Sequence, residues 1–294
     1  MPGRPVDTIG GVLASAAVRL RESGIETARL DAELLLGHVL HTTRTRLAID
    51  ANDPVDATSI KAFESLLDRR IQGESVAYLI GFREFMRHEF AVGPGVLVPR
   101  PETELMVERA CETIPRLWPT GTVRVLDLCT GSGAIACSLA LSVEADRLFI
   151  TGSDVSEAAL AYARRNRAAL GLDYRVELVQ GDLLRWTSGP WDLILTNPPY
   201  LRPDQIDDNP DLIAEPRLAL DGGHLGLELI ERILVQATSR VAATFAMMIE
   251  IDPDQAAEAA GLAARRFPEA TVTIVPDLTR RARFIDIERV ETNV

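Results

Sequence analysis

The chain has 294 residues, of which 47% are hydrophobic, and this is enough for one large domain and a smaller one. Its formal net charge of −12 at pH 7 argues against broad contact with a phosphate backbone, so we expect no direct nucleic-acid partner. No apolar run approaches the ~20 residues of a membrane span and the first residues lack a signal-peptide core, which predicts a cytoplasmic protein without membrane contact.

The residues before about position 85 predict a small helical bundle. Three segments have the apolar spacing of amphipathic helices: residues 9–21, 28–40 and 56–72. In the second segment, Leu30 and Leu34 are predicted to lie on the apolar stripe. Because such short helices are not stable alone, they should pack together. We assign residues 1–77 to this domain and expect it to dock a protein substrate; the alternative is that it only shields the sheet.

A change of pattern between residues 78 and 101 predicts a β-hairpin that links two domains. Aromatic and β-branched residues are interrupted here by Gly and Pro. The segment ends in PRPETE, where a helix should open and run towards Leu117. Arg100 and Glu102 in this segment are candidates for binding substrate. The alternative is a helix start whose acidic residues complement the helix dipole.

Strand and helix patterns alternate from residue 123 onward. The predicted strands are 123–127, 148–154, 175–179, 193–196, 244–251, 271–275 and 284–290. The predicted helices are 134–143, 156–170, 224–239 and 253–267. This alternation predicts an α/β fold with a doubly wound, mostly parallel sheet, to which we assign residues 102–294. Ligands of such sheets bind beyond the carboxyl ends of the strands.

The predicted strand ends carry residues that suit a nucleoside. The first strand runs into DLCTGSG (127–133), whose two glycines let the backbone approach a ligand. This GxG pattern lacks the third glycine of the dinucleotide fingerprint and is weak alone. Asp154 ends the second strand, where it could accept hydrogen bonds from ribose hydroxyls, and Asp182 follows the third, where it could meet an adenine amino group. Each acid alone is more often a cap or turn residue.

The strand at 193–196 stops at Asn197-Pro198-Pro199-Tyr200. Neither proline can continue a central strand, because each lacks a backbone N–H. Asn197 Oδ1 and the Pro198 carbonyl could each accept a hydrogen from a planar NH₂ group, in a carboxamide or a nucleobase, and turn its nitrogen towards an electrophile. Tyr200 would pack on the planar group. The alternative is a tight turn after a strand.

Cysteine and histidine show no metal-binding spacing. The three cysteines form no CxxC pair, and the four histidines form no HExxH pattern. We therefore expect neither a metal site nor a disulfide framework.

The order DLCTGSG, Asp154, GDL and NPPY resembles the seven-stranded, Rossmann-like S-adenosylmethionine-dependent methyltransferases. Further segments are similar to the HemK/PrmC family: residues 28–35, 78–81, 98–104 and 215–223. Members of that family methylate the side-chain nitrogen (N5) of the glutamine in the Gly-Gly-Gln loop of peptide-chain release factors. The resemblance therefore implies S-adenosyl-L-methionine as cofactor and release factors as protein partners, and we expect a monomer.

The resemblance also implies roles for individual residues. The loop at 129–133 would cradle the methionine part of the cofactor, Asp154 the ribose, and Asp182 with Leu183 the adenine. The residues assigned to the cofactor are Asp127, Cys129, Thr130, Gly131, Ser132, Gly133, Asp154, Asp182, Leu183 and Asn197. Those assigned to catalysis are Asn197, Pro198, Pro199 and Tyr200, and these four bind substrate together with Arg100 and Glu102.

Four positions depart from the family pattern. Cys129 and Asp252 stand where glycine is usual, and His224 and Ala282 stand where an acid is frequent. A small side chain at Cys129 is expected to be tolerated if its φ stays negative. The departures leave open a paralogue that methylates another amide or amine. A nucleic-acid amino-methyltransferase and a cofactor-binding regulator without catalysis are further alternatives.

Overall fold

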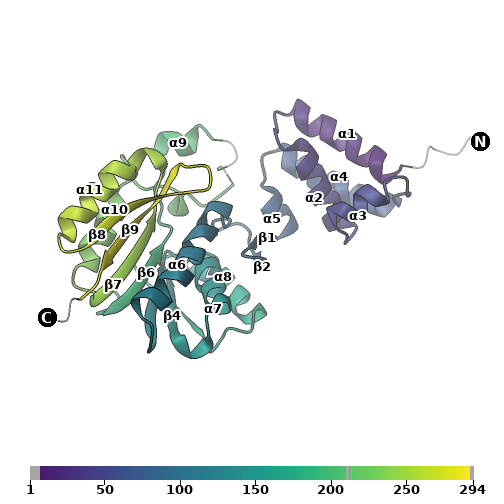
Figure 1. The fold of residues 1–294 in the computed structure, drawn as a ribbon. Helices are drawn as coiled ribbons and strands as arrows, with labels where there is room; N and C mark the ends of the chain where they lie inside the picture. The colour runs from purple at the N-terminus through teal and green to yellow at the C-terminus, as the bar shows by residue number, and fades with distance from the viewer. Residues whose placement is uncertain (1–6, 210–211, 213, 292–294) are drawn as a thin grey trace, which may run out of the picture. The chain divides into compact units, whose positions relative to one another are not determined.

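The computed structural model describes residues 7–209, 212 and 214–291 (Figure 1). The chain divides into two compact units, one ending at Phe82 and the other containing residues 83–209 and those from 215 onward. The division predicted at residues 77 and 101 stays a prediction. Within the described ranges, no helix has both the length and the apolar character needed to cross a membrane.

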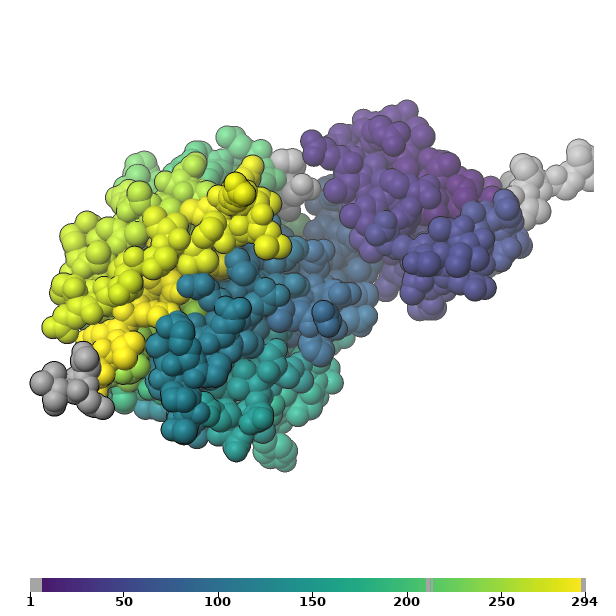
Figure 2. Space-filling model, in the orientation of Figure 1, coloured from purple at the N-terminus to yellow at the C-terminus, as the bar shows by residue number. Residues whose placement is uncertain are grey.

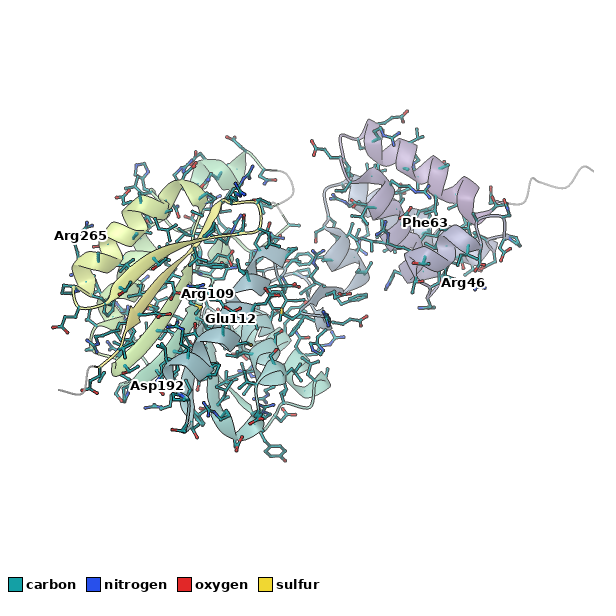
Figure 3. The ribbon with its side chains drawn as sticks, in the orientation of Figure 1. Arg46, Phe63, Arg109, Glu112, Asp192 and Arg265 are labelled. Carbon is teal, nitrogen blue, oxygen red and sulfur yellow. The ribbon has the colours of Figure 1, made fainter. Side chains whose placement is uncertain are left out.

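The first unit is a bundle of short helices: α1 (Ile9–Glu22), α2 (Ala28–Val39), α3 (Arg44–Ile49), α4 (Ala57–Ile71) and α5 (Val76–Ile80). Phe63 is fully buried and lies among these helices (Figure 3). A buried ion pair joins Arg70 of α4 to Asp31 of α2 at 2.7 Å. On the face drawn in Figure 2, the side chains of the bundle close over this core. The predicted helical bundle is confirmed.

The prediction for the apolar stripe of α2 is wrong. Leu30 is 38% exposed and Leu34 only half-buried. The buried positions of the helix are instead Ala28, Asp31, Ala32, Leu35, Leu36 and Gly37. Leucines occur almost all round this helix, so spacing alone does not reveal the face that meets α1 and α4. The short helices α3 and α5 were not predicted either, although Thr43 and Ser75 cap their first turns.

A two-stranded hairpin, β1 (Phe82–Phe85) and β2 (His88–Ala91), precedes the main sheet. It is shorter than the predicted segment 78–101, because α5 occupies the start of that segment and residues 92–100 form a loop. Phe85 and Phe90 are buried edge to face, with ring centroids 6.0 Å apart. Asn166 accepts a hydrogen bond from Ala91 N at 2.7 Å and donates one to Ser132 O at 2.9 Å. This amide ties the hairpin to the glycine loop.

The main sheet has seven strands in the order β5-β4-β3-β6-β7-β9-β8. Their bounds are β3 (Val123–Leu128), β4 (Leu148–Asp154), β5 (Val176–Gln180), β6 (Trp191–Thr196), β7 (Val241–Glu250), β8 (Thr271–Pro276) and β9 (Ala282–Arg289). Strands β3 to β7 pair in parallel, whereas β9 is antiparallel to both of its neighbours. The predicted doubly wound, mostly parallel sheet is confirmed, with strand ends within about three residues of prediction.

Helices cover both faces of this sheet (Figure 1). They are α6 (Glu104–Leu117), α7 (Ala134–Ser142), α8 (Glu157–Ala169), α9 (Pro203–Asp207), α10 (Glu228–Ala237) and α11 (Ala256–Arg266). Side chains of each strand alternate between two cores: Val125 packs with α6 and α7, and Leu126 packs with α10 and α11. The strands are apolar on both faces because both faces are buried.

Helix α10 begins four residues later than predicted, at Glu228 rather than His224. The preceding residues form a tight loop in which Gly223 has φ +93°. The Glu228 side chain accepts a hydrogen bond from His224 N at 2.9 Å and occupies the space beside Gly223. A side chain at position 223 would displace the flexible end of Glu228, and the left-handed φ of this residue favours glycine.

Candidate active site

A cavity of about 570 Å³ lies at the carboxyl ends of β3, β4 and β6, within the second unit. Its size is within the usual range for small-molecule sites. Predicted site residues that line it are Arg100, Cys129, Thr130, Gly131, Ser132, Asp154, Asp182, Leu183, Asn197 and Pro199. Five predicted residues do not line it: Glu102, Asp127, Gly133, Pro198 and Tyr200. Residues from five separate stretches of sequence therefore line one cavity.

The loop after β3 bends through left-handed backbone conformations. Gly131 has φ +56° and Gly133 has φ +80°, where glycine is favoured. Cys129 has φ +61°, so the condition under which a side chain was expected to be tolerated here, a negative φ, is not met. The backbone of the loop, and not the residue type, sets this angle, and the cysteine side chain bears the steric cost. Glycine would adopt the same conformation without that cost.

The buried side chain of Asp127 holds this loop through hydrogen bonds. Its Oδ2 accepts hydrogen bonds from Thr130 Oγ1 at 2.5 Å and from Ala136 N at 3.0 Å. Its Oδ1 is buried and has no hydrogen-bond partner among the described residues. Burial raises the pKa of Asp127 to about 7, and the nearby Asp154 carboxylate adds to this effect.

Asp154, at the end of β4, lines the cavity and also shapes the loop. Its Oδ2 accepts a hydrogen bond from Gly131 N, and its Oδ1 accepts one from Ser156 N, both at 2.9 Å. Burial raises the pKa of this carboxyl group. The carboxylate thus joins the second strand end to the glycine loop of the first.

Asp182 lies in ion pairs. Its carboxylate meets Arg232 of α10 at 2.9 Å and Arg185 at 3.1 Å. Leu183 beside it is 5% exposed, has φ +51°, and presents an apolar surface to the cavity. At this end of the cavity, Asp182 is therefore already neutralised by two arginines.

The Asn197–Tyr200 loop is held from several sides. Gln255 donates a hydrogen bond to the Tyr200 carbonyl at 2.7 Å, and Leu201 pairs with Asp221 in an isolated bridge. Gly222 packs so closely that a Cβ would lie 2.7 Å from the Tyr200 Cα. Strand β6 ends at Thr196, as predicted. The loop that follows the strand is therefore fixed by contacts with Gln255, Asp221 and Gly222.

Asn197 belongs to a hydrogen-bonded chain that reaches Glu250. Its Nδ2 donates to Thr103 Oγ1 at 3.2 Å, and Thr103 donates to Glu250 Oε2 at 2.7 Å. The Tyr200 hydroxyl donates to the other carboxylate oxygen, Glu250 Oε1, at 3.1 Å. Among the described residues, none donates a hydrogen bond to Asn197 Oδ1 or to the Pro198 carbonyl. Two acceptors of this loop therefore remain free.

Arg100 lines the cavity and forms an ion pair with Glu215 at 2.5 Å. Glu215 is 6% exposed and also accepts a hydrogen bond from Val98 N at 3.2 Å. It thus fastens the segment before η1 (Pro101–Thr103) to the segment before η4 (Arg217–Ala219). Glu102, the other predicted substrate contact, is exposed and outside the cavity lining.

Comparisons with known proteins agree with this architecture. Residues 11–81 match the PrmC N-terminal domain, and residues 106–240 match the methyltransferase small domain. A release factor glutamine methyltransferase of Moorella thermoacetica is 38% identical over 278 residues, which cover 94% of this chain and 96% of that protein. The chain belongs to the release factor glutamine methyltransferase family.

Other members of the release factor glutamine methyltransferase family are similarly close. The protein of Bordetella pertussis is 42% identical over 239 residues, covering 80% of this chain and 85% of that protein. A crystal structure of a methyltransferase from Pyrococcus furiosus aligns with a TM-score of 0.51 at 16% identity, covering 78% of this chain and all of that one. At that identity the likeness concerns the fold alone. The chain is a methyltransferase, and the family resemblance is confirmed.

The family resemblance implied glycine at the position of Asp252, and the structure explains how an acid fits. Asp252 has φ −69°, so no left-handed conformation is needed. Its side chain accepts hydrogen bonds from Asp254 N at 2.9 Å and from Gln205 Nε2 at 3.2 Å. The residue caps the helical turn that follows β7. No contact explains the histidine at 224 or the alanine at 282.

Thr103, Glu215 and Glu250 were not predicted as site residues of this methyltransferase. Glu250 carried a signal in the sequence, because it is an acid at the end of the apolar run 245–249. A buried acid in such a strand requires polar partners. Thr103 and Glu215 lie in the segments 98–104 and 215–223 that resemble the family, but no local pattern singles out either residue within its segment.

Two carboxyl groups near the cavity should make stability depend on pH. Burial raises the pKa of Asp127 from 3.8 and that of Glu250 from 4.5, both to about 7. Between about pH 4 and pH 7 the folded chain therefore holds more protons than the unfolded chain. The free energy of unfolding should fall as pH rises through this window, by at most about 1.4 kcal/mol per pH unit for each group.

Urea unfolding across this pH window measures the effect. We expect Asp127→Asn and Glu250→Gln each to flatten the decline, because each variant removes one group that titrates. Gln72→Ala, which changes an exposed residue of the bundle, should keep the wild-type slope. Slopes in both acid variants equal to the wild-type slope would contradict the raised pKa values.

Proposed function

We propose that this methyltransferase transfers a methyl group from S-adenosyl-L-methionine to the side-chain amide nitrogen (N5) of the glutamine in the Gly-Gly-Gln motif of peptide-chain release factors. The observation that carries the proposal is the free acceptor Asn197 Oδ1, on a residue that lines the cavity, with the free Pro198 carbonyl next to it in the chain. The glycine loop and Asp154 line the same cavity. Family membership supports the same reaction. The proposal takes the enzyme as a cytoplasmic monomer that contacts no nucleic acid or membrane.

The residues of the cavity fit this cofactor. A Cβ built on Gly131 would lie 4.0 Å from its nearest neighbours, the Cys129 carbonyl oxygen and the Val96 side chain, so the space beside this glycine is open. The bare backbone therefore leaves room for a ligand against the loop. Asp154 offers acceptors for ribose hydroxyls, and Leu183 offers an apolar face for a base. Asp127 Oδ1 is an unpaired acceptor below the loop. When bound, S-adenosyl-L-methionine supplies a methyl group that is already electrophilic.

The chain's own residues would prepare the glutamine amide. An amide nitrogen is a poor nucleophile, because its lone pair is delocalised into the carbonyl. Asn197 Oδ1 and the Pro198 carbonyl would each accept one of its two hydrogens and hold the nitrogen towards the cavity. Arg100 and Pro199 would line the entrance. Positioning is the main contribution of the protein. The amide nitrogen becomes acidic as its bond to the methyl carbon forms and the carbon–sulfur bond breaks, so it would lose one proton without a strong general base.

The role that we propose for Asp182 differs from the expected one, which was to bind the adenine of the cofactor. Because Arg232 and Arg185 hold its carboxylate, we propose that Asp182 contributes by fixing Leu183 and Arg232 around the cavity. Tyr200 is held away from the cavity lining by Glu250 and Gln255, and we propose that it braces Asn197. The helical bundle is proposed to dock the release factor.

Mass spectrometry of methylated release factor tests the proposal. Purified enzyme, S-adenosyl-L-methionine and release factor should give one added methyl group on the peptide that contains Gly-Gly-Gln, located on its glutamine. Methylation at any other residue, or of small amides only, would overturn the substrate assignment. Cofactor binding measured by calorimetry in the same preparation separates loss of cofactor from loss of substrate.

A further inference from the structure

We propose that Glu250 is a positioning residue that sets which way the Asn197 side-chain amide faces, acting through the Thr103 hydroxyl. The inference rests on the proposed function, because it concerns the amide that would hold the substrate glutamine. Glu250 does not line the cavity and acts only through its neighbours.

The carboxylate of Glu250 is enclosed and has a partner on each oxygen. It is 1% exposed, and Thr103 is 4% exposed. Oε2 accepts from Thr103 at 2.7 Å and Oε1 accepts from the Tyr200 hydroxyl at 3.1 Å. Thr103 in turn accepts from Asn197 Nδ2 at 3.2 Å. One acid therefore connects two residues of the Asn197–Tyr200 loop with the start of α6.

The direction of these hydrogen bonds follows from what each group can donate. At a pH above its raised pKa of about 7 the Glu250 carboxylate is ionised and only accepts, and a hydroxyl has one hydrogen. The Thr103 hydrogen is committed to Glu250, so Thr103 can offer Asn197 only lone pairs. Those lone pairs must face the NH₂ end of the amide, which turns Asn197 Oδ1 to the other side. The reversed amide would place two acceptors against each other.

Without this constraint neither of the two orientations of the Asn197 amide is favoured. Its oxygen and nitrogen ends have almost the same shape, so packing discriminates poorly between the two orientations. Only one orientation presents an acceptor to a substrate NH₂ group. Glu250 is thus needed to fix the direction of the hydrogen bonds from Asn197 through Thr103, and not to transfer a proton.

The charges around Glu250 leave it free for this task. Arg283 and Glu102 are the charged side chains that influence it, one favouring and one opposing its ionised form. Arg283 is itself paired with Asp277 at 3.0 Å. The two oxygens of Glu250 therefore accept hydrogen bonds from the hydroxyls of Thr103 and Tyr200. A simple structural role would predict loss of stability in variants, whereas the positioning role predicts loss of rate with the substrate still bound.

Kinetics of two conservative variants, measured well above pH 7 so that Glu250 is ionised, test the inference. Glu250→Gln keeps the size of the side chain but can donate as well as accept, which releases the Thr103 hydrogen to point either way. Thr103→Val removes the link. Each should lower kcat by about 10- to 100-fold with KM for release factor and Kd for S-adenosyl-L-methionine almost unchanged, and Thr103→Ser should restore most of the rate.

Matched controls are available elsewhere in the same domain. Asp286 is 2% exposed and paired with Arg109 at 2.8 Å, and Thr113 is 2% exposed on α6. Asp286→Asn and Thr113→Val remove a buried acid and a buried hydroxyl away from Asn197, so kcat should stay near wild type. In an Asn197→Ala background, Glu250→Gln should lower kcat no further, because the amide that it orients is gone.

A spectroscopic readout separates this inference from the proposed function. The side-chain NH₂ signals of Asn197 in a ¹⁵N–¹H spectrum are identified by their loss in Asn197→Ala. They should shift in Thr103→Val and Glu250→Gln but not in Asp286→Asn. Unmoved signals, or a Glu250→Gln rate loss that adds fully to that of Asn197→Ala, would overturn the inference. If the wild type fails to methylate release factor, the proposed function falls while the spectrum still decides the role of Glu250.

Discussion

Asn197→Ala should lower kcat by roughly 100- to 1,000-fold while the affinity for S-adenosyl-L-methionine stays almost unchanged. The variant deletes the free Oδ1 acceptor and the donor to Thr103, but it leaves the glycine loop and Asp154 in place. Stopped assays of methyl transfer at saturating cofactor, together with calorimetric binding of the cofactor, measure the two quantities separately.

Gln72→Ala provides a matched control for this substitution, since it truncates an exposed amide of the bundle. Its kcat should equal that of the wild type. If Asn197→Ala weakened cofactor binding as much as it slowed turnover, Asn197 would be acting on the cofactor and not on the substrate amide.

Asp154→Ala should weaken binding of S-adenosyl-L-methionine at least about 100-fold. The carboxylate holds Gly131 N and Ser156 N at 2.9 Å and also faces the cavity, so its loss removes a ligand contact and loosens the loop. A hydrogen bond to a charged group contributes about 1.5–3 kcal/mol. Two such bonds, from the ribose hydroxyls of the cofactor to Asp154, would account for this factor. Calorimetry with the cofactor alone gives the number.

Asp182→Ala is the comparison that makes this test specific. Asp182 also follows a strand and lines the cavity, but its carboxylate is neutralised by Arg232 and Arg185. We therefore expect its removal to weaken binding by no more than about tenfold, the loss of one ordinary hydrogen bond of about 0.5–1.5 kcal/mol. Equal losses in the two variants would show that the pairing of Asp182 with arginines does not lower its importance.

Much of the fold follows from local sequence patterns. The apolar run of β6 and the two prolines after Asn197 fix where the strand ends, because proline cannot continue a central ladder. The alternation of apolar strands and amphipathic helices is visible in the sequence, and it shows that Asp154 and Asp182 stand at strand ends. Local chemistry therefore located the cavity, and ten of the predicted site residues line it.

The parts that were missed depend on distant contacts. Thr103 and Glu250 are 147 positions apart in the chain, and no local pattern relates them. The left-handed conformation of Cys129 is imposed by the loop between β3 and α7, against the preference of its residue type. Leu30 is exposed because the packing partners of α2, and not its own composition, select the buried face. Tertiary context decided each of these features.

Transfer of labelled methyl from S-adenosyl-L-methionine to purified release factor tests the central claim most directly. A release factor in which the glutamine of Gly-Gly-Gln is changed to alanine provides the comparison. The account predicts labelling of the wild-type factor and none of the altered factor. Equal labelling of both factors, or no labelling by enzyme that binds the cofactor, would contradict it.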